Sequence, residues 1–324
     1  MRNLLITLAH QIGLRNDADS MWFVRQLEQE LTKEYEKVFP KYSMANGDIL
    51  PFDTEVDAGA ETYVYYFVEP IGMAKILNTY ADTDIPEVGV AGKATTGKCV
   101  AISNFMAWST QDARTAAMAK RDFVRLKKTA SKQGHVQQWN TLGWVGSTAH
   151  GVFGLLTHPN ITHTFAPLNG GLSSTLWENK TFEEIAADFA TLINTPSNLT
   201  NDIESVDTVV VPSNKWRALQ GRPVAAANGS NISIAGWLEA TYPQVTFVAD
   251  PFMQSENHAD TEFAGKNICV AYTKDPDKAS FVLPLDYTIN SPQEVKLRIE
   301  TYTESRCGGA KIPAPLSVHV LHSI

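Results

Sequence analysis

The chain has 324 residues, of which 44% are hydrophobic and 19% charged, a composition typical of a globular protein with a substantial core. Its formal net charge of −8 argues against a dedicated nucleic-acid-binding protein, because such proteins are usually basic. The three cysteines are far apart and form no CxxC or Cys/His metal motif, so we expect reduced thiols in a cytoplasmic setting. No apolar stretch is long enough to span a membrane, and the N-terminal apolar run is too short for a signal peptide.

Residues 17–37 are predicted to form an amphipathic helix that Pro40 ends. The apolar residues recur at spacings of three and four, and they include Met21, Val24, Leu27 and Leu31. This pattern indicates a buried face, but it leaves open whether the same subunit or a neighbouring one buries it.

Residues 61–69 are predicted to form a β-strand that is apolar on both faces. A strand covered on one face alternates apolar and polar residues, whereas here six consecutive positions are apolar or aromatic. These positions are Tyr63, Val64, Tyr65, Tyr66, Phe67 and Val68. We expect a hairpin with residues 98–105, joined by a Gly/Asp/Pro-rich loop at 78–97. Because an isolated hairpin is marginal in water, the ribbon predicts a surface completed by other chains.

A long helical region is predicted from residue 109. Ser109 and Asp112 fit a capping box, and Asp122 can cap a second segment that ends near Gly143 and Gly146. The rest of the chain alternates short helices and strands, which predicts an α+β fold with one segment leaving the body. The helices are expected at 182–193, 213–219 and 234–240, and the strands at 207–211, 245–249, 267–272, 281–285 and 294–303.

No motif nominates a catalytic centre. Residues 92–99 approximate the phosphate-binding pattern GxxxxGKS/T, but Cys99 replaces the magnesium-binding hydroxyl, and a strand follows where a helix is required. His150, His158 and His163 lack the HExxH spacing, so we expect them at turns or core edges. We therefore expect neither enzymatic activity nor a cofactor or metal.

Six basic residues lie within 13 positions of the long helical region: Lys120, Arg121, Arg125, Lys127, Lys128 and Lys132. A basic helix in an acidic chain can face phosphates. The alternative is a solvated face that pairs with acidic neighbours, and the charge run by itself favours this alternative.

Six segments in chain order carry a family resemblance: ILPFDT at 49–54, GAET at 59–62, GMAKI at 72–76, TQDARTAAMA at 110–119, HGVFGLLTHPN at 150–160 and CGGA at 307–310. Together they resemble the major capsid proteins of tailed phages with the Hong Kong 97 (HK-97) fold, in the branch related to encapsulin shells. The resemblance covers most of the chain from about residue 20 onward.

The resemblance implies a division of the chain into an arm, an extended loop and two domains. The arm is expected at 1–50, the extended β-hairpin loop at 51–108, a peripheral domain with its spine helix at 109–160, an axial domain at 161–280, and peripheral strands that return to the axial domain at 281–324. It further implies a structural subunit that assembles in the host bacterial cytoplasm, as hexamers and pentamers, into an icosahedral head around double-stranded DNA.

The resemblance also implies roles for the residues singled out above. The ribbon and arm residues would contact neighbouring subunits, and the six basic residues would contact packaged DNA without reading its sequence. Scaffolding, decoration and portal proteins are candidate further partners. The best-known member carries a long N-terminal scaffolding segment, which we do not expect here because the predicted arm helix begins within about 20 residues of Met1. The alternatives are an encapsulin-like nanocompartment around an enzyme cargo and an unrelated enzyme with a convergent pocket.

Overall fold

The computed structural model describes residues 40–324, with gaps at 77–84, 119–121, 172, 225–231 and 258–263. The chain divides into two units, 1–41 and 42–324, and the description concerns the second. The arm helix predicted at 17–37, with its four apolar residues, lies outside the described residues.

A five-stranded sheet separates two hydrophobic cores. In strand β10 (Ile268–Tyr272), Val270 and Tyr272 pack into one core, while Cys269 and Ala271 pack into the other. The neighbouring strand β8 (Thr208–Pro212) divides its side chains in the same way. Because successive strand residues point to opposite faces, a strand that is apolar at every position fits only where both faces are covered.

The sheet has the order β7-β16-β10-β8-β9, and three helices contribute to the core on one of its faces. Strands β8 and β9 are parallel, as are β16 and β7, whereas β10 is antiparallel to its two neighbours. The additional strands are β7 (Thr162–Phe165), β16 (His319–His322) and β9 (Thr246–Asp250), and the helices are α5 (Phe182–Thr200), α6 (Ser213–Gly221) and α7 (Ile234–Thr241).

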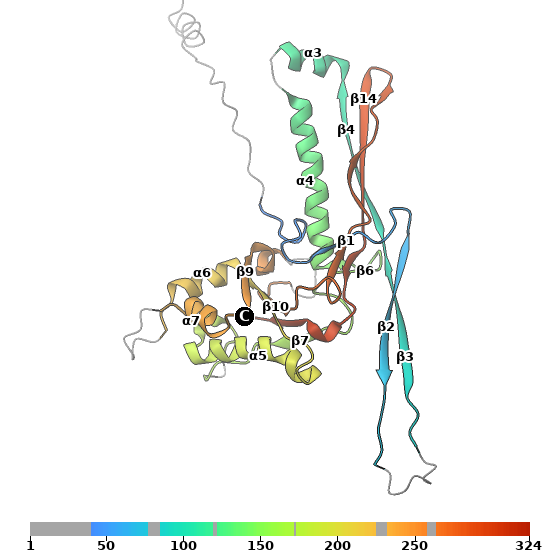
Figure 1. The fold of residues 1–324 in the computed structure, drawn as a ribbon. Coiled ribbons are helices and arrows are strands. Elements are labelled where there is room, and N and C mark those ends of the chain that lie inside the picture. Colours follow the sequence, from blue (N-terminus) through green and yellow to red (C-terminus); the bar gives the residue numbers. More distant parts are fainter. Residues whose placement is uncertain (1–39, 77–84, 119–121, 172, 225–231, 258–263) are drawn as a thin grey trace, which may run out of the picture. The chain divides into compact units, whose positions relative to one another are not determined.

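A second layer is built on strand β4 (Val100–Ser109), which pairs with β14 (Arg298–Cys307) over ten residues. Helix α4 (Phe123–Trp144) runs along these two strands, as Figure 1 shows. Strands β12 (Leu285–Ile289) and β13 (Gln293–Val295) also pair with β14.

Both predicted helix starts are confirmed. Helix α3 (Thr110–Met118) begins with a reciprocal capping pair, because the Asp112 N–H donates to Ser109 Oγ and the Ser109 N–H donates to the Asp112 carboxylate. The Asp122 carboxylate accepts the N–H of Arg125 at the start of α4. These contacts satisfy N–H groups that have no partner within the helix.

The predicted hairpin has a different second strand. Strand β2 (Thr62–Ile71) pairs with β3 (Gly89–Lys98), so of the expected partner segment 98–105 only Lys98 takes part, opposite Thr62. Residues 89–97 of the segment read as a loop therefore form a strand, and in residues 92–98 the backbone is engaged in pairing with β2 instead of cradling a phosphate. Residues 100–109 pair with β14 because their apolar inner face, which includes the buried Met106, is covered there by α4.

Two predicted strands are each divided in the structure. The run at 281–285 splits between β11 (Ser280–Val282) and β12, and the run at 294–303 splits between β13 and β14. At the second division Lys296 has a φ of 59°, a left-handed conformation that turns the chain. The remaining elements are β1 (Phe52–Asp53), β5 (Gly146–Ser147), β6 (Val152–Phe153), β15 (Gly309–Lys311) and 3₁₀ turns at Trp177–Asn179, Pro251–Met253, Ser255–Asn257 and Pro315–Ser317.

Among the described residues, no helix is both long and apolar enough to cross a membrane.

Candidate inter-subunit surface

The β2–β3 ribbon is attached to the rest of its unit through Tyr63. The Tyr63 hydroxyl donates a hydrogen bond to the Gly308 carbonyl at 3.3 Å, and burial raises the pKa of this hydroxyl. The ring lies over Gly97, where a Cβ would come within 2.1 Å of Tyr63 Cζ. A glycine is therefore required beneath the ring, and Tyr65 extends the attachment by stacking on Tyr63 with centroids 6.3 Å apart.

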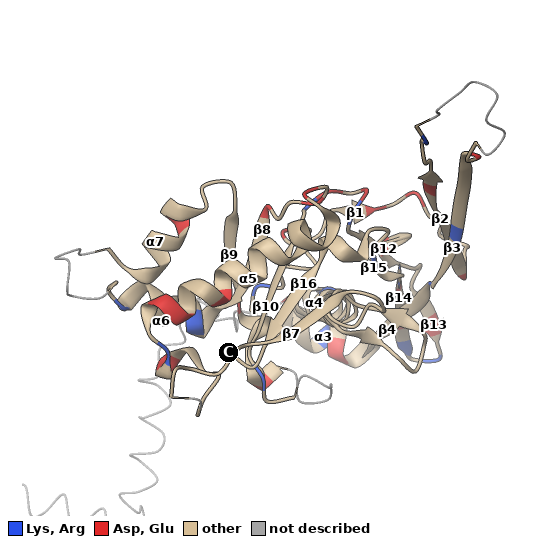
Figure 2. Ribbon diagram, turned by 90° about the horizontal axis from the view of Figure 1, so that it is seen from below, with Lys and Arg blue, Asp and Glu red and all other residues tan. Residues whose placement is uncertain are grey.

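Beyond Tyr65 the ribbon has little cover from the described part of its own subunit. Tyr66 is 75% exposed, Val68 59% and Val90 72%, and every described residue from 66 to 71 and from 89 to 94 is exposed. In Figure 1 these strands project as a two-stranded ribbon, and in Figure 2 they are drawn mainly in the colour of uncharged residues. An exposed apolar surface of this kind is typical of a binding site for another protein.

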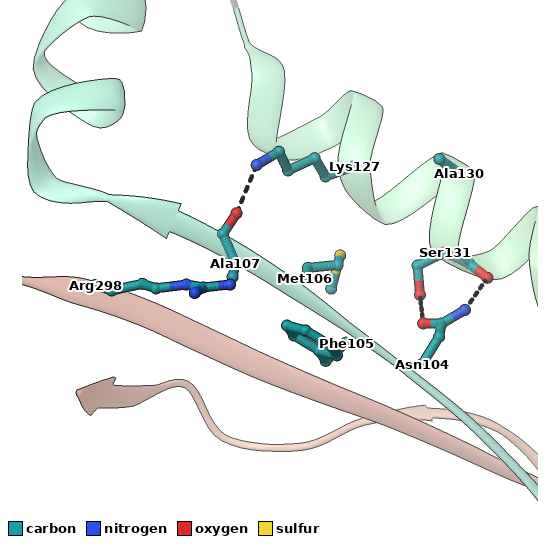
Figure 3. A pocket seen from close by; sticks show the side chains of 8 residues that line it. All are labelled: Asn104, Phe105, Met106, Ala107, Lys127, Ala130, Ser131 and Arg298. Atoms are coloured by element: carbon teal, nitrogen blue, oxygen red, sulfur yellow. Dashed lines mark hydrogen bonds between the residues drawn. The ribbon is translucent and has the colours of Figure 1, made fainter.

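The described basic residues of α4 fall on two sides of the helix. Arg125, Lys128 and Lys132 are exposed and lie at spacings of three and four, which places them on one face. Lys127 turns toward β4, where its Nζ donates to the Ala107 carbonyl at 2.6 Å (Figure 3). Lys120 and Arg121 lie outside the described residues.

A shallow groove of about 460 Å³ lies between α4 and β4 (Figure 3). Its two cations are engaged, since Lys127 binds a backbone carbonyl and Arg298 lies 3.4 Å from the Glu300 carboxylate. The remaining lining residues are Asn104, Phe105, Met106, Ala107, Ala130 and Ser131. This groove lacks a nucleophile with a neighbouring base, so its chemistry is not that of an active site.

Helix α4 contacts β14 through polar groups in addition to apolar ones. His135 Nδ1 lies 2.7 Å from Ser305 Oγ, and His135 Nε2 lies 3.1 Å from Thr303 Oγ1. Trp139, one turn further along, donates from Nε1 to Ser305 Oγ at 3.1 Å. Burial lowers the pKa of His135 because a charged imidazole loses its hydration there. Sequence reasoning missed His135, since a single helical histidine carries no spacing signal.

The three histidines noted in the sequence do not converge. His150 is exposed and bonds Ser147, His158 is buried beside Phe153, and His163 lies on β7 next to His322. Within the described residues, no group of three or more His, Cys, Asp or Glu side chains is placed to hold a metal ion.

A comparison with models of protein families identifies the family of this chain. The profile described as "Major capsid protein" matches residues 72–324. The chain belongs to the major capsid protein family. The resemblance found in the sequence and the predicted structural function are thereby confirmed. A search of curated proteins found no match.

Solved capsid structures share the fold of this major capsid protein. The capsid of Myoviridae phage XM1 aligns with a TM-score of 0.77 and 16% identity, covering 93% of this chain and 98% of that chain. The capsid of a native GTA particle, computed with C5 symmetry, aligns with a TM-score of 0.63 and 11% identity over 92% and 95%. A virus-like particle from Pyrococcus furiosus aligns with a TM-score of 0.51 and 12% identity over 85% and 90%. The α+β, Hong Kong 97-type fold class is confirmed.

The polar contact between α4 and β14 predicts a pH-dependent stability. Replacing His135 by Gln removes the two imidazole contacts with the hydroxyls of Ser305 and Thr303. At about 0.5–1.5 kcal/mol for each hydrogen bond, this should lower the free energy of unfolding at pH 8 by about 1–3 kcal/mol. The folded-state pKa of His135 lies below its unfolded value, so its stabilising contribution is complete above about pH 6.5 and is lost as the pH falls toward the folded-state pKa. The difference between wild type and His135→Gln should therefore shrink below about pH 6.5 in denaturant titrations.

The control is His150→Gln, an exposed position where the change should cost less than about 0.5 kcal/mol at either pH. A difference between wild type and His135→Gln that stays constant from pH 8 to pH 5 would contradict the assignment.

Proposed function

We propose that this chain is the major structural subunit of the icosahedral head of a tailed bacteriophage, in which many copies enclose double-stranded DNA. The family match over residues 72–324 supports this proposal. The C5 symmetry of the aligned GTA capsid supports assembly of this chain into pentamers, with hexamers elsewhere in the shell.

The observation that carries the proposal is the uncovered distal half of the β2–β3 ribbon. A two-stranded ribbon is marginally stable alone, and this one is attached to its own subunit mainly near Tyr63 and Tyr65. A neighbouring subunit supplies the missing cover. Each contact is small, but a closed shell repeats it many times, and multivalency then raises the overall strength without further chemistry.

The structure suggests a refined division of the chain. The extended loop corresponds to residues 62–98, because residues 100–109 belong to the β4–β14 layer. That layer, with α4 as the spine helix, forms the peripheral domain, and the five-stranded sheet with α5, α6 and α7 forms the axial domain. The return of the C-terminal segment to the axial domain corresponds to β16, which pairs with β7 and β10.

The exposed cations of α4 are proposed to face the packaged genome. Arg125, Lys128 and Lys132 form one basic face, which suits sequence-independent contacts to phosphates. We no longer include Lys127 among the proposed DNA-contacting residues, because its ammonium group binds the Ala107 carbonyl. The arm contacts of Met21, Val24, Leu27 and Leu31, and the scaffolding, decoration and portal partners, rest on the sequence resemblance.

The alternative is a nanocompartment shell that holds an enzyme cargo. A virus-like particle from Pyrococcus furiosus also has this fold. The two functions differ in the contents of the particle, which are double-stranded DNA in one and a cargo protein in the other.

Particle formation tests the proposal. Expressed wild-type chain should form closed shells in negative-stain micrographs, and particles from the natural source should hold nuclease-protected double-stranded DNA. Replacing residues 66–94 by an Asn-Gly turn keeps the attached part of the ribbon, since Tyr65 and Thr95 are directly paired. We expect this shortened chain to keep its circular dichroism spectrum but to form no closed shells. Shells at wild-type yield from the shortened chain would contradict the role of the ribbon.

Charge reversal tests the basic face of α4. Particles of Lys128→Glu should form at normal yield but release their DNA at lower salt than wild type, because one phosphate contact becomes a repulsion. Arg217→Glu, an exposed position on α6, is the matched control and should behave as wild type. Equal DNA retention by both variants and wild type would remove α4 from the proposal.

A further inference from the structure

The two faces of the β2–β3 ribbon differ in cover and in charge. The strand register places directly paired residues on the same face, so the register assigns every side chain of the ribbon to one side or the other. One face, here called the rooted face, carries Tyr63, Tyr65, Phe67, Glu69 and Ile71 with their partners Gly97, Thr95, Lys93, Ala91 and Gly89. On the other side lie Val64, Tyr66, Val68 and Pro70 with Thr96, Ala94, Gly92 and Val90, and these eight residues are here called the uncharged face. The remaining pair on that side, Thr62 and Lys98, is not part of this face, because it lies at the body end of the ribbon, where Lys98 approaches Gly151.

The rooted face is partly used within the subunit. Its first two pairs, from Tyr63 to Thr95, are half-buried against the segment around Gly308. Its distal part carries Glu69 and Lys93, diagonal neighbours of opposite charge. Burying these two charges in an apolar contact would cost their hydration. This face is therefore poorly suited to a dry interface.

The uncharged face is neither packed against the body of the subunit nor charged. All eight of its residues are exposed in the subunit, and none carries a charge. Tyr66, Val68 and Val90 supply most of its apolar surface, with exposures between 59% and 75%. Covering this face removes apolar surface from water without desolvating any ionised group.

Gly92, in the middle of β3, has no explanation among the described residues of the subunit. Glycine in a strand interior costs roughly 0.5–1 kcal/mol relative to alanine, so a structural reason is expected. At Gly97 the reason is the Tyr63 ring, but a Cβ at Gly92 would meet nothing within 4 Å, and its φ lies outside the left-handed region. A glycine within a strand often marks a place where another chain approaches closely. At Gly92 the described residues of the subunit supply no such chain.

We propose that the uncharged face of the ribbon packs against a second copy of this chain, with Gly92 as the point of closest approach. Gly92 lies directly opposite Val68 and between Val90 and Ala94 on the same face of β3, so it forms a low point into which a side chain of the neighbour fits. The inference rests on the proposed shell function and specifies which surface makes the contact.

The size of the uncharged face is consistent with a contact that forms only within a shell. Seven residues at about 3.4 Å each and a width of about 10 Å give roughly 240 Å². A specific two-body interface needs about 800 Å² per partner. One such contact is too small to hold two free copies together, and its repetition around a closed shell supplies the missing strength.

Gly89 provides a matched control for Gly92. It also lies in β3, is exposed, and would meet nothing within 4 Å of an added Cβ, but it belongs to the rooted face. Both Gly92→Glu and Gly89→Glu should keep the wild-type thermal unfolding curve. Under conditions in which wild type assembles, we expect Gly92→Glu to lower the yield of closed shells at least tenfold and Gly89→Glu to change it less than twofold.

Equal loss in the two variants, a larger loss in Gly89→Glu, or no loss in either would overturn the assignment of the face while leaving the shell function intact. Failure of the wild-type chain to form shells would instead overturn the proposed function, and this inference with it.

Thiol labelling gives a second, independent readout. In assembled shells Gly92→Cys should react with a bulky maleimide at least tenfold more slowly than in dissociated chains, whereas Gly89→Cys should react at similar rates in both. The native thiols give little background, because Cys269 and Cys307 are fully buried and burial raises the pKa of all three cysteines. Equal labelling of Gly92→Cys in shells and in dissociated chains would overturn the proposal.

Discussion

The uncovered distal half of the β2–β3 ribbon is the constraint on which the proposed function of this subunit depends. Ordinary strands bury at least one face within their own chain, but residues 66–71 and 89–94 are exposed on both. Such a ribbon is marginally stable in water, because ordering it costs conformational entropy. The burial of its apolar side chains would offset this cost, but in the isolated subunit these side chains remain hydrated. The favourable free energy is therefore available only when another molecule covers the ribbon, which links the stability of this segment to assembly.

The rest of the described unit is self-sufficient. The five-stranded sheet has a core on each side, and strands β8 and β10 contribute side chains to both. Helix α4 is held on β14 by hydrogen bonds from His135 and Trp139 as well as by apolar packing. Tyr63, seated over Gly97 and bonded to Gly308, joins the ribbon to this body. The unit thus combines a well-packed body with an exposed apolar ribbon that a neighbouring subunit can cover, as the proposed capsid function requires.

Local signals in the sequence predicted the local structure well. The caps at Ser109 and Asp122 act within four residues, and the helices that they begin were found from the sequence. Strand pairing is not local: Ser103 of β4 lies 200 residues from its contact Thr303. The glycine- and threonine-rich β3 has the composition of a loop, so its pairing with β2 was missed. The run of apolar residues at 63–68 was enough to predict that another chain covers the ribbon. The difference between its two faces could be recognised only from the register of β2 and β3, which places Glu69 and Lys93 on the same face.

Hydrogen–deuterium exchange of the ribbon in shells and in unassembled chains tests the central claim most directly. The amides of residues 66–71 and 89–94 should exchange rapidly in the unassembled chain and at least tenfold more slowly in shells. Those of β10, buried in the subunit core, should exchange slowly in both states and serve as the internal reference. Equal exchange of the ribbon in the two states, whether slow or fast, would contradict the account, because a second copy would then not be what covers it.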